Sequence, residues 1–333
     1  MTGAIPAFLP NGAALLCHWG RALMDVILHV GAHRTATTSF QHYMRGQRDR
    51  LDPCGVAFWG PARTRKTVFP GLFRTVAVDR RHRTARKAEG RVRMMTSRLQ
   101  DARYRHLLIS DENLIGTSSQ NFRRAALYPA IGERMARVMA ALDGQVTRIV
   151  ITIRAQDQWW ASCAALIVAR GHPVPTARKC AAIAAHPRGW RDVITDLACA
   201  APEAEILVLP FEEAAGHPDA LLRAALPTAA PGDRAARWLN RSASLTDLRA
   251  VLRREGADPA LLPDGTGRWQ PFDAPQCATL SEQYADDLHW LAAGAEGLAH
   301  LTRNPSRSRA AQDLPAGQLT KGQDNAIGQG HLA

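Results

Sequence analysis

Short runs of apolar residues recur along the chain, and each run is continuous instead of alternating with polar positions. Four of them occupy residues 26–30, 106–110, 148–153 and 205–209. Continuous runs rich in Ile, Val and Leu are typical of strands buried on both faces of a parallel sheet. We therefore predict four parallel strands at these positions.

The segments between and after these runs carry apolar residues at helical spacing. The expected helices span residues 37–50, 84–102, 123–142, 157–170, 189–200 and 280–301. Strands and helices that alternate along a chain form α/β folds. The pattern predicts a doubly wound fold with a mainly parallel sheet and flanking helices.

Composition divides the chain into three parts. Residues 24–302 carry all the predicted elements and form one domain. Residues 1–23 precede a second methionine, Met24, and no basic segment precedes their apolar part, so we expect an N-terminal extension or a mis-assigned start and not a signal peptide. Residues 303–333 are polar and lack periodicity, which predicts a disordered tail.

The remaining composition indicates a globular protein. Apolar residues make up 46% of the 333 positions, with eight Trp and eight Phe. The six cysteines are scattered, and they form neither a CxxC pair nor a Cys/His ligand spacing. We expect reduced thiols in the cytoplasm and no metal site. No apolar run approaches the roughly 18–20 residues that a membrane helix needs.

The net charge of +12 is concentrated in one stretch. Residues 63–105 hold fourteen Lys and Arg against three Asp and Glu, a net charge of +11. The stretch is either a solvated helix face or an electrostatic funnel for an anionic cofactor or an acidic substrate. Because no nucleic-acid recognition motif accompanies it, we expect no nucleic-acid partner.

The first candidate site is the loop GAHRTATTS at residues 31–39, between a predicted strand and a predicted helix. Backbone N–H groups at a helix start have no intrahelical acceptor and attract phosphates. Thr37, Thr38 and Ser39 add hydroxyls, and the forked guanidinium of Arg34 suits a phosphate. Simple helix capping is the alternative explanation.

The second candidate site follows the run at 148–153. Arg154 lies at the carboxyl end of this predicted strand, where α/β folds bind ligands, and Ser162 lies about two helical turns later. The two side chains can hold a second phosphate together. Alternatively, Arg154 closes a surface ion pair and Ser162 is exposed.

Together the two sites resemble those of sulfotransferases that use 3′-phosphoadenosine-5′-phosphosulfate (PAPS). In that family, a Pro/His-Lys-Ser/Thr-Gly-Thr-Thr loop binds the 5′-phosphosulfate, and an Arg with a Ser eight positions later binds the 3′-phosphate. The matching residues here are His33-Arg34-Thr35-Ala36-Thr37-Thr38, followed by Ser39, and the pair Arg154 and Ser162. Residues 207–222 and 281–291 are similar to the family's late strand-turn-helix and to the terminal helix of bacterial members.

The resemblance implies PAPS as donor, no metal, and a P-loop-like sulfotransferase architecture. Arg34, Thr35, Ala36, Thr37 and Thr38, with help from Ser39, would hold the 5′-phosphosulfate. Arg154 and Ser162 would hold the 3′-phosphate.

Two positions depart from the family pattern. Arg34 stands where the family has Lys, and it keeps the charge but has a planar fork. Ala36 stands where the family has Gly, so we expect a negative φ at this residue.

Sulfonate transfer needs a base that removes the proton from the hydroxyl or amine that accepts the group. We expect Glu112, which follows the predicted strand 106–110, to be this base. Many family members have an acidic residue in this region. Asp111 is a second candidate, or a cap for the following turn. His33 is the competing base, because it lies in the phosphate loop itself; alternatively it only shapes that loop.

The run FWGPARTRK at residues 58–66 combines two aromatic residues with three cations. It could stack on a sugar or on adenine and neutralise an acidic acceptor. Alternatively, Trp59 belongs to the core and the cations are solvated.

We therefore expect a sulfotransferase that moves a sulfonate group from PAPS to a hydroxyl or amine, and the basic stretch favours an acidic glycan as acceptor. A P-loop nucleotide kinase or ATPase is one alternative, since Asp111 and Glu112 resemble an acidic strand end, although the loop lacks the Lys-Ser/Thr pair. A non-catalytic relative that binds a nucleotide or polyanion is the other.

Overall fold

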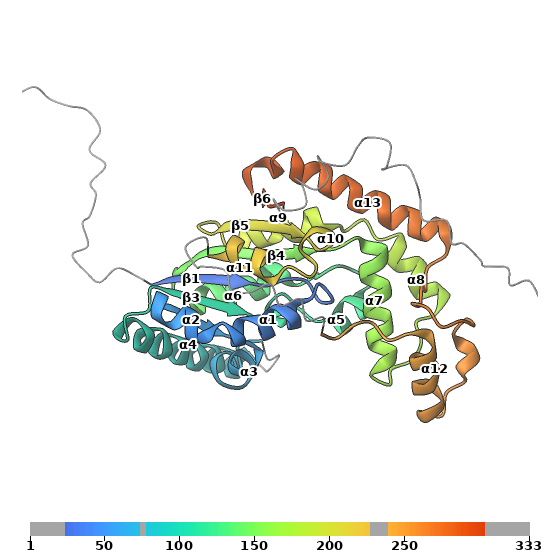
Figure 1. The fold of residues 1–333 in the computed structure, drawn as a ribbon, viewed down its shortest axis with the longest axis horizontal. Helices are drawn as coiled ribbons and strands as arrows, with labels where there is room; N and C mark the ends of the chain where they lie inside the picture. The colour runs from blue at the N-terminus through green and yellow to red at the C-terminus, as the bar shows by residue number, and fades with distance from the viewer. Residues whose placement is uncertain (1–23, 74–77, 227–238, 304–333) are drawn as a thin grey trace, which may run out of the picture.

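The computed structural model describes residues 24–73, 78–226 and 239–303. Its centre is a parallel sheet of six strands in the order β2-β3-β1-β4-β5-β6 (Figure 1). The strands are β1 (Asp25–His29), β2 (Val56–Trp59), β3 (His106–Ser110), β4 (Val146–Ile153), β5 (Glu205–Pro210) and β6 (His300–Leu301). The predicted α/β class and parallel sheet are confirmed.

Helices connect the strands. They are α1 (Thr37–Gly46), α2 (Arg48–Leu51), α3 (Pro61–Arg63), α4 (Val78–Asp101), α5 (Ser118–Arg124), α6 (Ile131–Ala141), α7 (Gln156–Ala169), α8 (Ala177–Ala184), α9 (Trp190–Ala200), α10 (Phe211–Ala214), α11 (Pro218–Ala225), α12 (Leu245–Arg254) and α13 (Ala274–Ala292). Shorter helical turns are η1 (Asp52–Cys54), η2 (Thr64–Val68), η3 (Glu112–Leu114), η4 (Pro259–Leu261) and η5 (Ala295–Gly297).

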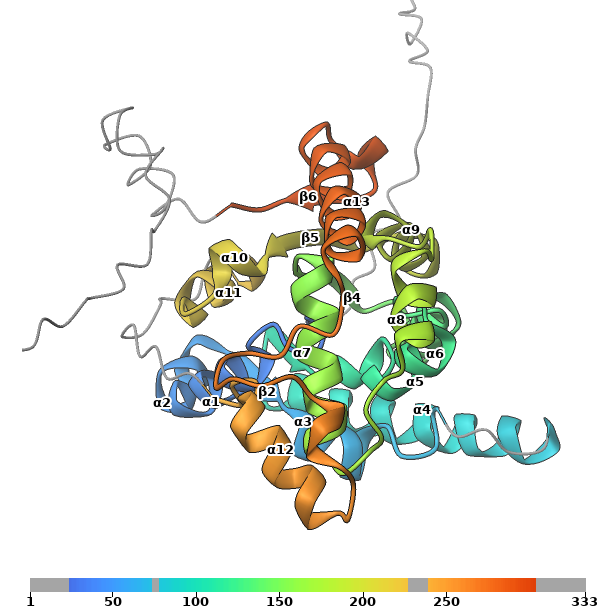
Figure 2. The ribbon, with the colours of Figure 1, turned by 90° about the vertical axis from the view of Figure 1, so that its right-hand side faces the viewer.

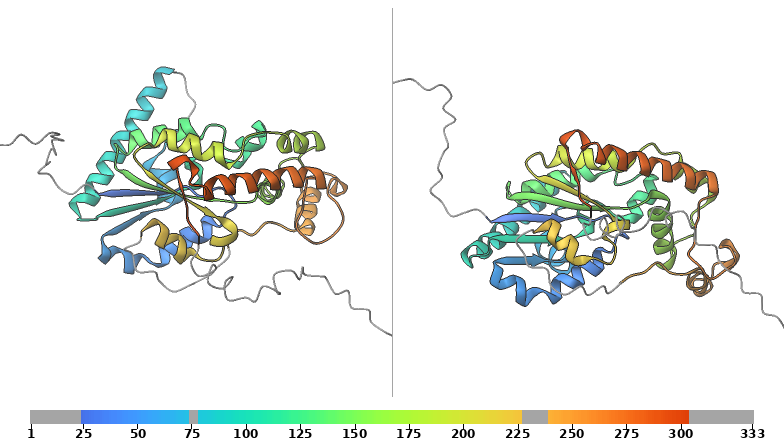
Figure 3. Two further views of the ribbon diagram at one scale, coloured as in Figure 1. Left: turned by 90° about the horizontal axis from the view of Figure 1, so that it is seen from above. Right: turned by 45° about the horizontal axis from the view of Figure 1, so that its top comes forward.

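Successive residues of the central strands point to opposite faces of the sheet, and each face has its own core. Val26 and Leu28 pack into a large cluster with α4, α6, α7 and α9, whereas Ile27 packs into a smaller cluster with α1 and α11. Figure 3 shows these two helical layers on either side of the sheet. Burial on both faces explains why the strands are continuous apolar runs.

The strand order creates a crevice beside β1. The chain passes from β1 to β2 and β3 on one side, and then crosses to β4 on the other. α1, which follows β1, packs on one face, and α7, which follows β4, packs on the other. Their starts therefore diverge at the carboxyl end of the sheet, which is where ligands bind in open α/β sheets. Figure 2 views the molecule turned by 90° from Figure 1 and shows α7 beside α12.

Three predicted helices were wrong in extent. The segment 37–50 forms two helices, α1 and α2, which are separated at Gln47. The segment 123–142 is interrupted between α5 and α6, because Ala125 and Tyr128 have positive φ and Pro129 follows. The last helix ends at Ala292, since Gly294 and Glu296 have positive φ, and a short strand then continues the sheet. Two strands, β2 and β6, were not predicted.

The proposed extension at 1–23 and nearly all of the proposed tail, residues 304–333, lie outside the described residues. Within the described ranges, every helix is too short or too polar to cross a bilayer.

Candidate functional site

A cavity of about 760 Å³ opens at the carboxyl ends of β1 and β4. This volume falls within the roughly 300–1,000 Å³ typical of small-molecule sites. Five arginines line it: Arg34, Arg154, Arg170, Arg241 and Arg268. Among the described residues that line the cavity, Glu112 is the one carboxylate. The cavity is therefore strongly cationic and suits an anionic ligand.

The loop after β1 places backbone amides at the cavity through two left-handed residues. Arg34 has φ +66° and Ala36, the N-cap of α1, has φ +62°. The expectation of a negative φ at Ala36 was wrong. Positive φ here lets the chain turn sharply into α1, and alanine adopts it at a cost of roughly 1–2 kcal/mol. Gly31 stays small for another reason, because a Cβ there would lie 2.9 Å from His29 Nε2.

The hydroxyls of the loop separate into two groups. Thr37 and Thr38 line the large cavity, but Thr35 and Ser39 line a smaller one of about 30 Å³ on the other side of Ala36. Thr35 donates a hydrogen bond to the Ala32 carbonyl at 2.6 Å, and Ser39 accepts one from the Leu239 amide at 3.0 Å. In this structure Thr35 and Ser39 support the loop.

Thr37 carries an unsatisfied polar atom. Its side chain is buried, with 4% exposure, and its Oγ1 has no hydrogen-bond partner among the described residues. A buried hydroxyl without a partner is unfavourable and calls for an explanation. An anionic ligand in the cavity would supply the missing acceptor.

Arg34 spans the crevice. Its Nε donates to Ser162 Oγ at 2.9 Å and its Nη2 donates to Ser242 Oγ at 3.1 Å, and the two serine oxygens are 2.7 Å apart. The loop after β1 and the helix after β4 therefore meet directly, although their contacting residues lie 128 positions apart.

Arg154 lies next to this contact. Its Nη1 donates to the Arg34 carbonyl at 3.2 Å, and its guanidinium lies 4.7 Å from the centre of the Phe211 ring. Its own carbonyl accepts a hydrogen bond from Trp190 Nε1 at 2.8 Å. Burial lowers the pKa of both Arg34 and Arg154. Arginine nevertheless remains protonated in proteins, so the cavity holds desolvated cations that an anion would stabilise.

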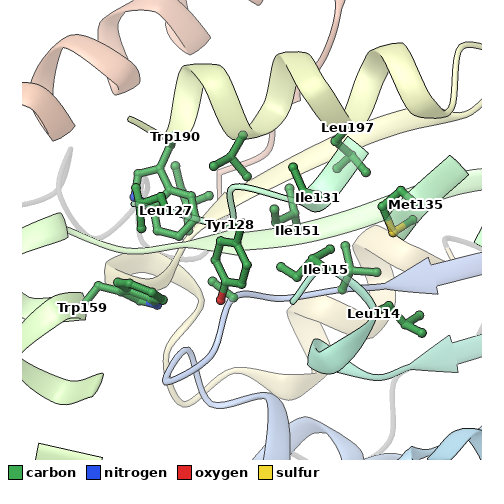
Figure 4. Packing of buried hydrophobic residues seen from close by; sticks show 14 of the residues in the cluster. Leu114, Ile115, Leu127, Tyr128, Ile131, Met135, Ile151, Trp159, Trp190 and Leu197 are labelled. Carbon is green, nitrogen blue, oxygen red and sulfur yellow. The ribbon is translucent and has the colours of Figure 1, made fainter. Parts of the chain in front are cut away.

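His33 is held by four hydrogen bonds. Its amide donates to the Tyr128 hydroxyl at 2.8 Å, and its carbonyl accepts from Trp159 Nε1 at 2.6 Å. Its Nδ1 lies 2.9 Å from the same hydroxyl, and its Nε2 lies 3.0 Å from Asn113 Oδ1. Figure 4 shows the Tyr128 hydroxyl pointing toward the loop after β1, which carries His33.

These contacts fix the protonation of His33. The tyrosine hydroxyl accepts from the amide and so donates to Nδ1, while Nε2 donates to Asn113. Burial also lowers the pKa of His33, so the ring is neutral at physiological pH. Since both ring nitrogens are engaged, His33 shapes the loop in this structure, and the geometry gives little support for His33 as a base.

Glu112 begins η3, is separated from β3 by Asp111 alone, and lines the cavity. One carboxylate oxygen accepts from Arg65 Nη2 at 2.9 Å and the other accepts from Gln41 Nε2 at 3.1 Å. Burial alone would raise the pKa of Glu112, but the charge of Arg65 and the hydrogen bonds outweigh it and lower this pKa. Glu112 is thus an ionised carboxylate in the wall of the cavity that the five arginines line.

Asp111 has a structural position. Its side chain is buried and accepts hydrogen bonds from Thr64 Oγ1, Arg65 and the Asn113 amide. The predicted capping role is confirmed.

Trp59 is also buried, with 1% exposure, so it belongs to the core and cannot stack on a ligand.

Several residues of the site were not found from the sequence. Tyr128 and Asn113 fix the loop, Phe211 packs on Arg154, and Ser242 and Arg268 line the cavity. Phe211 follows β5, so the position of strand ends could have identified it. Ser242 and Arg268 lie in irregular segments and carry no local motif.

The chain was compared with models of protein families and with curated proteins, and neither comparison gave a match. Within the described ranges, no three His, Cys, Asp or Glu side chains are grouped so that they could hold a metal ion.

Proposed function

We propose that the protein is a sulfotransferase that uses PAPS as donor and a hydroxyl or amine as acceptor. One observation carries the proposal: the phosphate-type loop after β1 and the pair Arg154 and Ser162 line a single arginine-rich cavity. A nucleotide with phosphates at both its 3′ and 5′ positions needs two such anion sites within reach of one nucleoside.

The residues present fit this donor. Thr37 offers an unsatisfied buried hydroxyl, and the start of α1 offers amides without intrahelical acceptors. These groups, with Thr38 and Ala36, would hold the 5′-phosphosulfate. Arg154, Ser162 and the neighbouring Arg268 would hold the 3′-phosphate.

The donor supplies a sulfonate group on a good leaving phosphate, and the protein's side chains would supply charge and a base. Arg34 is the cation of the loop itself, and release from Ser162 and Ser242 would let it stabilise the charge on the leaving phosphate. Glu112 would accept the proton of the acceptor, since it is the carboxylate on the cavity wall.

The decisive experiment compares thermal protection by two nucleotides. Adenosine 3′,5′-bisphosphate without metal should raise the melting temperature, whereas ATP with magnesium should raise it less. Transfer of labelled sulfonate from PAPS to a panel of saccharides, lipids and phenols then tests catalysis. Protection by ATP alone would reject the proposal in favour of a kinase or ATPase.

A binding protein without catalytic activity is the second candidate. It is favoured by Arg34, whose guanidinium is engaged with Ser162 and Ser242 instead of extending over the loop. This candidate predicts protection by adenosine 3′,5′-bisphosphate but no transfer to any acceptor. It also predicts that Arg34→Lys, which restores the family residue, does not create transfer.

A further inference from the structure

One guanidinium joins the candidate base to a buried carboxylate. Arg65, in η2, donates from Nη2 to Asp111 Oδ1 at 2.6 Å and to Glu112 Oε1 at 2.9 Å. Its Nε adds bonds to both oxygens of Asp111, at 3.1 and 3.3 Å. Arg65 therefore forms three hydrogen bonds with Asp111 but one with Glu112.

The two carboxylates differ in how firmly they are held. The Asp111 side chain is 3% exposed and is also bonded by Thr64 and by the Asn113 amide. The Glu112 side chain is 17% exposed, and Arg65 is 40% exposed. Both carboxylates share Arg65, but Glu112 is the more exposed of the two and has one bond to it against three for Asp111, so its ion pair is the weaker one. The Asp111 pair is the anchor, and the Glu112 pair is the one that another anion can replace.

We infer, on the basis of the proposed function, that Arg65 binds an anionic group of the acceptor and thereby releases Glu112 to act as base. The acceptor would then carry a carboxylate or sulfate near its reacting hydroxyl, as acidic saccharides do. Arg65 does not line the donor cavity, and its exposed side chain can be reached from solvent. Exchange of one anion for another keeps the guanidinium paired.

Release of Glu112 matters because a carboxylate bound to a guanidinium is a weaker base. In the transfer step the acceptor oxygen bonds to sulfur while its proton moves to Glu112. The bond between sulfur and the bridging phosphate oxygen breaks, and its electron pair leaves with adenosine 3′,5′-bisphosphate. No other reactant is needed.

Among the charged groups around Glu112, Arg65 has the largest effect on the pKa of its carboxylate. Gln41 of α1 binds the second carboxylate oxygen but does not titrate. His33 and His29 are near Glu112 and neutral, because burial lowers the pKa of both rings, and burial keeps Tyr128 neutral because it raises the pKa of the hydroxyl. Asp111 is already paired with Arg65.

The test uses an oligosaccharide that contains a uronate and its carboxyl-reduced form. Binding is measured by calorimetry on the full-length protein, and sulfonate transfer is measured with PAPS. Arg65→Gln should weaken uronate binding by at least about tenfold. It should also lower kcat/KM for the acidic acceptor while the neutral acceptor keeps its rate or gains. With the neutral acceptor, the acid limb of the pH profile should move to higher pH in this variant.

Two variants separate recognition from folding. Arg48→Gln removes an exposed arginine that pairs with Asp52 and should change neither binding nor the acceptor preference. Arg65→Lys keeps the charge and should restore part of the preference. Equal losses for both acceptors, or no uronate binding by the wild type, would overturn the inference. Binding of the donor site is measured separately with adenosine 3′,5′-bisphosphate. If this nucleotide does not bind, the proposed function is overturned, and the calorimetry with the uronate still tests the role of Arg65.

Discussion

At the scale of single residues, the loop after β1 carries two unfavourable features. Ala36 adopts a left-handed conformation, and Thr37 buries a hydroxyl without a partner among the described residues. Local strain of this kind is concentrated at binding sites, where the surrounding structure imposes it. Each feature predicts the effect of a substitution at that position.

Ala36→Gly should stabilise the protein by about 0.5–1 kcal/mol, because glycine adopts positive φ without steric cost and this gain exceeds the entropy it loses. Chemical denaturation measures the free energy of unfolding. The matched control is Ala136→Gly, at an exposed position in the middle of α6, which should destabilise by about 0.5–1 kcal/mol. Destabilisation by both substitutions would contradict the left-handed assignment.

Thr37→Val should leave the free protein as stable as before, or more stable by up to about 1 kcal/mol, because it removes an unsatisfied hydroxyl and keeps the shape. The same change should weaken binding of adenosine 3′,5′-bisphosphate. Denaturation and calorimetry on one preparation separate the two effects. A loss of stability with unchanged affinity would mean that the hydroxyl serves the fold.

Arg154→Ala should weaken binding of adenosine 3′,5′-bisphosphate by about 1.5–3 kcal/mol, the value of a hydrogen bond to a charged group. Arg148 is the control, since it lies near the start of β4, at the opposite end from Arg154, and pairs with Glu205. Arg148→Ala should leave affinity unchanged. Equal affinities for all three proteins would remove Arg154 from the site.

At the scale of elements, α13 supports the site through a buried carboxylate. Asp287 accepts hydrogen bonds from the Trp190 and Arg191 amides, at 2.7 and 3.0 Å, and so caps the start of α9. Trp190 in turn donates to the Arg154 carbonyl. α13 thus fixes the residue that follows the end of β4, Arg154.

Asp287 should make stability depend on pH. Burial raises its pKa to about 6 in the folded protein, above the usual value of about 4 in an unfolded chain. The folded state therefore binds the proton more tightly, and this contribution to stability is present below about pH 4 and lost as the pH rises through about 6. The stability of the wild type relative to Asp287→Asn should accordingly fall between pH 4 and pH 7.

Denaturation at several pH values measures this difference. Glu282→Gln is the control, because Glu282 is exposed on the same helix and is not among the charges that shift the pKa of Asp287, so this variant should keep the fall in stability seen for the wild type. A wild-type advantage that grows with pH would contradict the raised pKa.

At the scale of the whole molecule, the net charge of +12 and the five arginines of the cavity act together on an anionic ligand. Salt screens exposed charges over about 10 Å at 0.1 M. Affinity for adenosine 3′,5′-bisphosphate should therefore fall several-fold when NaCl is raised from about 0.05 to about 0.5 M. Adenosine, which lacks the phosphates, serves as the control, and equal salt dependence for both ligands would argue against charge recognition.

Much of the fold follows from local pattern, and the exceptions have physical reasons. The four central strands are buried on both faces, so their sequences are continuous and apolar. β2 is a shorter run, and β6 has two residues, too few for any periodicity. The break between α5 and α6 depends on Tyr128, whose positive φ is held by its buried ring and its contact with His33.

The sequence by itself determined the α/β class and placed Arg34, Glu112 and Arg154 after the ends of strands, because burial and strand direction are written into residues that are neighbours in the chain. The tertiary structure alone decided that Arg34 meets Ser162 and Ser242, that Arg65 joins Asp111 to Glu112, and that Thr35 and Ser39 face away. Those contacts depend on the order of strands in the sheet and on which face each helix covers. Both are settled by packing between segments far apart in the sequence, which no local pattern records.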